Sequence, residues 1–297
     1  MIDAAIVTAI RARLTSALAP PGEPMRPLRV DGHAAGWVDR PRAARLAAFD
    51  DVFRVDEEVI RFQPRLDGEA SRSDAMDRVA RTLAAEGALT AWRDERYAIA
   101  PAFGEPPWFL LERAAARYFG VRTFAVHVNG LVDAGEQASM WFARRSLVKS
   151  IDPGMLDNLV GGGVAAGQTV ASTLIKESQE EAGIGARLAA SARPAGRVET
   201  CRLHADGLQR ETIFAHDLAL PRTFSPAGLD GEAIEHRLVD FDAAARLIAN
   251  TSGRDVVTVD ASLVALDCLL RHHAIARDSP ERAVLEALRR PGPTQFD

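Results

Sequence analysis

The sequence contains little cysteine: Cys201 and Cys268 are its two cysteines, and they do not form a CxxC pair. We therefore expect neither a disulfide framework nor a cysteine-based zinc site, and two separate thiols are typical of a reducing compartment. The formal net charge of −5 provides no global basic field, so no nucleic-acid partner is expected. No apolar run approaches the ~20 residues that span a bilayer, and the N-terminus lacks the basic and apolar regions of a signal peptide. These absences predict a cytoplasmic protein without a membrane partner.

The chain has 297 residues, of which 47% are hydrophobic, which is enough for two domains of ordinary size. Residues 3–17 have helical spacing, residues 28–38 resemble two short strands around a glycine turn, and residues 71–86 form an amphipathic pattern. We expect residues 1–119 to form a small accessory α+β domain and residues 120–297 to form a second domain. The first part shows no nucleophile, metal cluster or phosphate loop, so its charged residues are expected to be a solvated face.

Cations and glycines follow one another in the middle of the chain. Arg144, Arg145 and Lys149 lie at the end of a predicted strand and just before a glycine-rich loop. Arginine forks match phosphate oxygens, although an exposed strand end with scattered charge would look the same. Gly162 and Gly163 in the loop allow backbone N–H groups to approach an anion. The order of these features favours a phosphate-binding role for all five residues.

The glycine loop leads into a predicted helix that ends at Gly183 and carries Glu177, Glu180 and Glu181. Positions i, i+3 and i+4 share one face of a helix, so the three carboxylates repel one another. A cation offsets this cost, and carboxylate oxygens suit a hard ion such as Mg²⁺ or Mn²⁺. The pattern predicts a metal site on this helix.

The spacing of this stretch resembles the box of the Nudix hydrolases, written G-x5-E-x7-R-E-U-x-E-E-x-G-U with U a bulky apolar residue. The chain matches from Gly162 through Gly183, and its three metal-facing glutamates are intact. It departs at Gln168, where the family has Glu, at Lys176, where it has Arg, and at Ser178, where it has an apolar residue. The resemblance implies an α/β/α sandwich with a mixed sheet and metal-dependent diphosphate hydrolysis. It also implies that Gln168 and Lys176 support the helix through a contact with each other.

A narrower resemblance lies around the box. Residues 126–130, 141–146 and 152–158 are similar to the Nudix branch related to thiamine pyrophosphokinase. This implies cleavage of oxidised forms of thiamine diphosphate to the monophosphate and phosphate. A hydrolase of another nucleoside or sugar diphosphate remains an alternative, as does a Nudix module that binds a ligand without catalysis. The expected partner is a small-molecule diphosphate, and a homodimer is compatible with the sequence.

The C-terminal part of the chain contributes one further candidate. Nudix enzymes often recruit a glutamate from a later loop as a ligand or base, and Glu232 has this position, although a solvated loop acid is nearly as good an interpretation. Glu211 and His216 lie on a predicted strand and could face a site from it, although each is more simply an exposed strand residue. Three helices are expected to close the chain.

The resemblance and the residues together predict a division of labour. Glu177, Glu180 and Glu181 would hold the cation, and Glu180 or Glu232 would orient the attacking water as general base. Glu177, Glu180 and Glu232 are thus the predicted catalytic residues. The cations before the loop would stabilise charge on the phosphate oxygens.

Overall fold

The N-terminal unit is a small α+β structure. The computed structural model describes residues 1–19, 22, 24–133, 138–289 and 296. The elements of this unit are β1 (Arg26–Val30), β2 (His33–Val38), α2 (Arg40–Leu46), β3 (Phe53–Val55), β4 (Ile60–Phe62), α3 (Glu69–Ala85), β5 (Arg96–Ile99), β6 (Phe109–Glu112), the short 3-10 helix η1 (Arg113–Ala115) and α4 (Ala116–Phe119). One sheet has the strand order β2-β1-β4-β3, and β5 pairs with β6 in a separate hairpin. Apolar residues at helical spacing bury one side of α3, including Met76, Val79 and Leu83. The predicted accessory α+β fold is confirmed.

The C-terminal unit is built on a seven-stranded mixed sheet. Its elements are α1 (Ala4–Ala17), β7 (Arg122–Val132), β8 (Ser139–Arg145), β9 (Leu156–Asn158), β10 (Val160–Gly163), α5 (Val170–Ala182), α6 (Ala186–Ala189), β11 (Arg193–His204), β12 (Gly207–Ala219), β13 (Ala233–Asp240), α7 (Phe241–Ala249), α8 (Val259–Arg271) and α9 (Arg282–Arg289). The main path runs β11-β12-β7-β8-β13, while β10 pairs with β7 and β9 pairs with β8. Strands β7 and β12 are parallel, and the other pairs are antiparallel.

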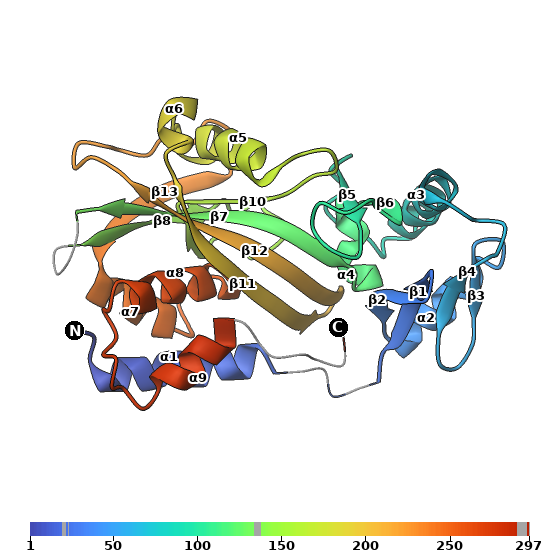
Figure 1. Cartoon of the computed structure of the whole chain (residues 1–297), viewed down its shortest axis with the longest axis horizontal. Helices are drawn as coiled ribbons and strands as arrows, with labels where there is room; N and C mark the ends of the chain where they lie inside the picture. Colours follow the sequence, from blue (N-terminus) through green and yellow to red (C-terminus); the bar gives the residue numbers. More distant parts are fainter. Residues whose placement is uncertain (20–21, 23, 134–137, 290–295, 297) are drawn as a thin grey trace.

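Helices cover both faces of this sheet. Helices α5 and α6 lie on one face, and α1, α7, α8 and α9 lie on the other (Figure 1). Leu174 and Ala182 of α5 pack with Val126 and Val128 of β7 in one apolar cluster. A larger cluster on the opposite face contains the apolar side of α8, whose residues are almost all buried. The predicted α/β/α sandwich with a mixed sheet is therefore observed.

Helix α1 does not pack with the accessory unit that follows it in the sequence. Its buried residues Val7, Ile10 and Leu14 belong to the apolar cluster of the C-terminal unit, and α1 contacts α7 and α9. The predicted accessory domain of residues 1–119 thus needs a correction over its first helix. The apolar residues at helical spacing predict the helix. They do not predict which part of the protein packs on it, because any apolar surface can bury them.

Glycines allow the two units to approach closely where they meet. Gly120 ends α4 with a φ of 56°, and a Cβ there would overlap the carbonyl oxygen of Trp37. Gly207 is the first residue of β12 and has a φ of 137°, and a Cβ there would overlap the carbonyl oxygen of Arg117 in α4. The start of β12 and helix α4 therefore approach each other at the backbone.

No strand is predicted from the sequence at the position of β13. In the structure its exposed and half-buried residues do not alternate regularly. It is held at the edge of the sheet by pairing with β8.

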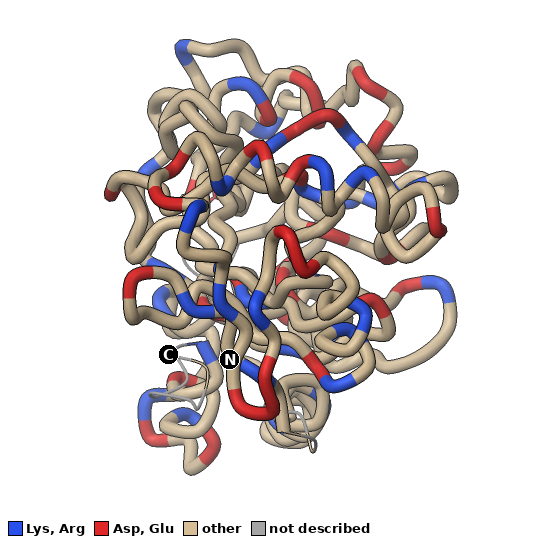
Figure 2. Tube along the Cα trace, turned by 90° about the vertical axis from the view of Figure 1, so that its right-hand side faces the viewer, with Lys and Arg blue, Asp and Glu red and all other residues tan. Residues whose placement is uncertain are grey.

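Figure 2 shows residues of both charge signs interspersed along the chain. Within the described residues, no helix combines the length and hydrophobicity that crossing a bilayer requires.

Candidate active site

Helix α5 has well-formed ends. The Thr169 side chain accepts a hydrogen bond from the Ser172 backbone N–H, and the Ser172 side chain accepts one from the Thr169 backbone N–H. This reciprocal pair satisfies N–H groups that the first turn leaves free. Gly183 ends the helix in the left-handed conformation with a φ of 65°. The predicted helix and its predicted end at Gly183 are confirmed.

Two of the helix glutamates lie against strand β10. The backbone N–H of Gly161 donates a 2.7 Å hydrogen bond to Oε2 of Glu181. A Cβ on Gly162 would overlap the carboxyl carbon of Glu177 and lie 2.8 Å from its Oε2. Glycine at position 162 is thus required by the approach of a carboxylate, which is a physical reason for the first glycine of the box.

Burial and mutual repulsion disfavour the charged forms of Glu177 and Glu181. Burial raises the pKa of Glu181 to about 8, and the nearby carboxylates of Asp157 and Glu177 act in the same direction. Burial also raises the pKa of Glu177, against the opposing effect of Lys176. Buried carboxylates that repel one another are stabilised by a cation. The carboxylate oxygens of Glu177, Glu180 and Glu181 are the donor type that a hard divalent ion prefers.

Lys176 contacts two of these acids, Glu177 and Glu180. Its Nζ lies 3.1 Å from Oε1 of Glu177 and 3.3 Å from Oε2 of Glu180. The expected contact between Lys176 and Gln168 is not among the hydrogen bonds of the described residues, because Lys176 points to these glutamates. Gln168 instead accepts a 2.8 Å hydrogen bond from the Ser172 hydroxyl and so supports the start of α5.

A cavity of about 490 Å³ lies beside strand β10, and both units line it. Gly161, Gly162 and Gly163 form part of its wall, and Tyr97 of β5 packs directly against Gly163. Burial raises the pKa of the Tyr97 phenol, so this group stays neutral. The cationic residues that line the cavity are Arg93, Arg113, Arg117, Arg145, Lys149 and Arg210. The accessory unit supplies the first three, so the expectation that its charges form only a solvated face is wrong.

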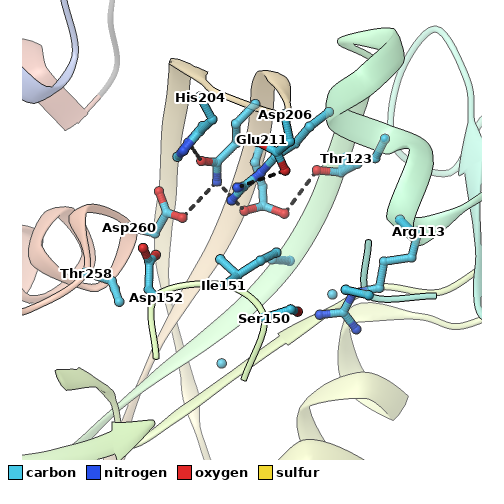
Figure 3. Close-up of a pocket in the computed structure, with 18 of the residues that line it drawn as sticks. Arg113, Thr123, Ser150, Ile151, Asp152, His204, Asp206, Glu211, Thr258 and Asp260 are labelled. Carbon is cyan, nitrogen blue, oxygen red and sulfur yellow. Dashed lines mark hydrogen bonds and ion pairs between the residues drawn. The ribbon is translucent and has the colours of Figure 1, made fainter. Parts of the chain in front are cut away.

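Acidic residues line the same cavity (Figure 3). The Gln209 amide donates to Glu211 at 3.3 Å and to Asp260 at 2.8 Å, and the Thr123 hydroxyl donates to Glu211 at 3.0 Å. Nε2 of His204 lies 2.8 Å from the amide oxygen of Gln209, so the NH₂ group of Gln209 points to the two acids. Burial, followed by the charge of Asp260, raises the pKa of Glu211. Oδ1 of Asp260 is buried and has no partner among the described residues.

The interpretation of Glu211 and His216 as exposed strand residues is therefore wrong. Glu211 faces the cavity wall, and His216 is 7% exposed. Strand β12 lies between β11 and β7, so both of its edges are paired, and most of its residues on both faces are buried. Alternation in a sequence shows that two faces differ, but it does not show that a polar face is buried.

The three cations predicted to bind phosphate do not all line the cavity. Arg145 and Lys149 line the cavity, where Arg145 donates to Asp157 at 2.8 Å. Burial lowers the pKa of Lys149, and the nearby charge of Glu181 opposes that shift. These two residues remain candidates for binding phosphate.

Arg144 points the other way, since neighbouring strand residues face opposite sides of a sheet. Its side chain is 2% exposed and donates to Glu235 at 2.6 Å and to Asp255 at 2.5 Å. It also donates to the backbone carbonyls of Gly154 and Arg254. These bonds occupy its guanidinium, so the predicted substrate-binding role of Arg144 is wrong and its role is structural.

Glu232 lies near two of the cations that line the cavity, Arg93 and Lys149. Its carboxylate pairs with Lys149 and lies 3.5 Å from Nη1 of Arg93. Its backbone carbonyl accepts a hydrogen bond from Ser146, which fixes this loop to the end of β8. Its role as metal ligand or base stays a prediction, because both cations now hold the carboxylate.

Comparisons with known proteins agree with this arrangement. A model described as "NUDIX domain" matches residues 122–258, and one described as "Domain of unknown function (DUF4743)" matches residues 13–123. "Nudix hydrolase 24, chloroplastic" of Arabidopsis thaliana is 35% identical over 86% of this chain and 69% of its own. The chain belongs to the Nudix hydrolase family.

A second curated relative and a solved structure are also similar to this chain. "Nudix hydrolase 20, chloroplastic" of Arabidopsis thaliana is also 35% identical, over 85% of this chain and 69% of its own. The crystal structure of DR0079 from Deinococcus radiodurans has a TM-score of 0.44 at 23% identity and covers 57% of this chain and 97% of that one. Helix α5 and strand β10 lie within the matched NUDIX domain, and the protein is a Nudix diphosphate hydrolase. The family generally uses divalent metal ions, which the donor set on α5 fits.

Proposed function

We propose that this Nudix hydrolase cleaves thiamine diphosphate-like compounds, above all oxidised ones, to the monophosphate and phosphate. The observation that carries the proposal is the set of charged residues that line the cavity. Arg145 and Lys149 would neutralise a diphosphate, and Glu211 of β12 and Asp260 of α8 line the same cavity. A thiamine-type molecule has a diphosphate at one end and an amino-substituted ring at the other. The resemblance of residues 126–158 to the thiamine-related branch supports the same assignment.

The residues of the chain would share the reaction in the following way. Glu177, Glu180 and Glu181 would hold Mg²⁺ or Mn²⁺, which when bound neutralises phosphate charge and lowers the pKa of a bound water. Glu180 is the most exposed of the three, with 42% of its side chain accessible, and it would orient the attacking water as general base, with Glu232 as the alternative. Arg145 and Lys149 would stabilise the phosphate oxygens as charge develops.

A second candidate function is ligand binding without hydrolysis. Lys176 lies between Glu177 and Glu180 and gives these two acids a cation from the chain itself. A protein that only binds its ligand would gain stability from this arrangement without any metal. Release of phosphate in the presence of Mg²⁺ separates the two functions.

The test is a panel of diphosphates with Mg²⁺ or Mn²⁺. Thiamine diphosphate and its oxidised forms are compared with ADP-ribose, UDP-glucose and deoxynucleoside triphosphates by kcat/KM. We expect the thiamine compounds to be hydrolysed most efficiently, and a clear preference for ADP-ribose or a nucleotide would contradict the proposal. Asp260→Asn, which removes one charge from the acidic residues of the cavity, should lower kcat/KM for thiamine compounds more than for UDP-glucose. The cytoplasmic location and the homodimer stay predictions.

A further inference from the structure

A buried chain of hydrogen bonds runs from the cavity into the core of the C-terminal unit. His127 lines the cavity and is 8% exposed. Its Nδ1 lies 2.7 Å from Oδ1 of Asn158, whose amide donates to Oδ1 of Asn129 at 3.3 Å. The Asn129 amide donates in turn to Oδ1 of Asp217 at 3.0 Å, and Nη2 of Arg271 donates to the same oxygen at 3.0 Å.

Asp217, at the buried end of this hydrogen-bond network, determines which group donates and which accepts in every bond of the network. Asp217 is bound by Arg271 and faces His272, and these hydrogen bonds hold its pKa below the usual range although burial opposes the shift. An ionised carboxylate only accepts hydrogen bonds. Asn129 must therefore turn its NH₂ group toward Asp217 and its oxygen toward Asn158.

Asn158 is oriented by two acceptors. Its NH₂ group faces Oδ1 of Asn129 and lies 3.4 Å from the backbone carbonyl of Ala261, which cannot donate. Its own oxygen is thus left for His127, so Nδ1 of His127 carries the proton. A second acceptor, Oδ1 of Asp157, lies 4.0 Å from the same nitrogen and favours the same tautomer. In a neutral imidazole with Nδ1 protonated, Nε2 is a pure acceptor.

Nε2 has no hydrogen-bond partner among the described residues. The ring lies over Gly161, where a Cβ would stand 3.2 Å from Nε2, so glycine leaves the ring edge open. His127 is paired across the sheet with Gly161 of the box on one side and with Ala215 of β12 on the other. An unpaired acceptor that lines a cavity is satisfied by a donor on the ligand.

We propose that His127 is a substrate-binding residue whose Nε2 accepts a hydrogen bond from an N–H or O–H group on the organic half of the substrate. Asp217 and Arg271 act as positioning residues that fix its tautomer through Asn129 and Asn158. This inference rests on the proposed function only in taking the cavity as the substrate site. It does not depend on which organic group the substrate carries.

The tautomer is measured first, in the protein without substrate. Nitrogen-15 NMR of the imidazole groups should show His127 protonated at Nδ1 and unprotonated at Nε2, with the signal assigned by its loss in His127→Asn. Asn158→Ala removes the acceptor and should shift the population toward the Nε2–H tautomer. A wild-type His127 that is protonated at Nε2 would overturn the proposal.

The second test separates binding from turnover. His127→Asn retains an N–H group near the Nδ1 position, so the bond to Asn158 is kept, but it removes the acceptor at Nε2. KM should rise about tenfold, the loss of one hydrogen bond, while kcat stays within about twofold and the melting temperature is retained. His127→Gln places a carboxamide oxygen near Nε2 and should recover part of this loss. Competitive inhibition by inorganic diphosphate, which has no organic half, should be unchanged.

The substrate for this measurement is whichever of thiamine diphosphate, ADP-ribose and UDP-glucose the wild-type protein hydrolyses with the highest kcat/KM. An unchanged KM for that substrate, or a fall in kcat alone, would overturn the role of His127. If ADP-ribose is the best substrate and KM still rises, the thiamine assignment fails while the role of His127 stands.

Discussion

The ring of Tyr97 lies against the backbone of Gly163, and a Cβ at position 163 would be 2.9 Å from its Cζ and would overlap its hydroxyl oxygen. Tyr97 belongs to the accessory unit and Gly163 to the Nudix box, so this contact joins the two units at the cavity. Gly163→Ala should therefore displace Tyr97, lower the free energy of unfolding by about 1–3 kcal/mol and raise KM. Gly185→Ala is the matched control, because nothing lies within 4 Å of a Cβ there. Equal effects of the two variants on KM would contradict this account.

Arg144 and Arg145 are adjacent in sequence but should respond differently to substitution. Arg144→Met leaves the carbonyls of Gly154 and Arg254 without their donor, while Arg237 still pairs with Glu235 and Asp255, and should cost about 1–3 kcal/mol of stability, measured by urea unfolding. Its KM at low temperature should stay close to that of the wild type. Arg145→Lys keeps a charge beside Asp157 but removes the planar fork, so it should raise KM with a small change in stability. A large KM effect of Arg144→Met in folded protein would return that residue to the substrate site.

The pKa of Glu181 predicts how the metal-free protein responds to pH. Its ordinary value of 4.5 is raised to about 8 in the folded protein. Between these values the folded state binds more protons than the unfolded state, so stability should fall as the pH rises from about 5 to 8. Melting temperatures in EDTA at several pH values check this, and Glu181→Gln should flatten the dependence. The same slope in wild type and variant would contradict the assignment.

The departures from the family box predict a tolerant pair of positions. Gln168 supports the start of α5, and Lys176 bridges Glu177 and Glu180, so both act on the helix and not on the substrate. Gln168→Glu combined with Lys176→Arg should therefore retain or raise kcat/KM. A marked loss of activity in a stably folded double variant would show that this pair is specific to the thiamine-related branch.

Local features of the fold can be predicted from the sequence, and tertiary ones cannot. The ends of α5 follow from Thr169 and Gly183, and its acids follow from their spacing, because each depends on residues within a few positions. The attachment of α1 depends on α7 and α9, which lie more than 200 residues away in the sequence. Strand β13 forms because β8 offers an edge, and its own pattern gives no sign of this.

Some residues of the cavity can likewise be predicted from the sequence, and others cannot. Arg145 and Lys149 are predictable from their position before the glycines. Arg113 and Tyr97 could not be assigned, because only the docking of the accessory unit brings them to the box. Glu211 is a strand residue whose burial comes from its neighbours in the sheet. Its signal in the sequence is a charged residue on a strand that also carries Arg210 and Asp217, so its charge alone does not distinguish it.

The central claim is that the carboxylates of α5 carry metal-dependent hydrolysis of a diphosphate. The most direct measurement is phosphate release from thiamine diphosphate in Mg²⁺ by wild type, by Glu181→Gln and by Glu86→Gln, whose exposed carboxylate pairs with Arg45 far from the box. The account predicts that Glu181→Gln loses at least about 100-fold in kcat at an unchanged fold, while Glu86→Gln keeps wild-type turnover. Wild-type turnover by Glu181→Gln would contradict it.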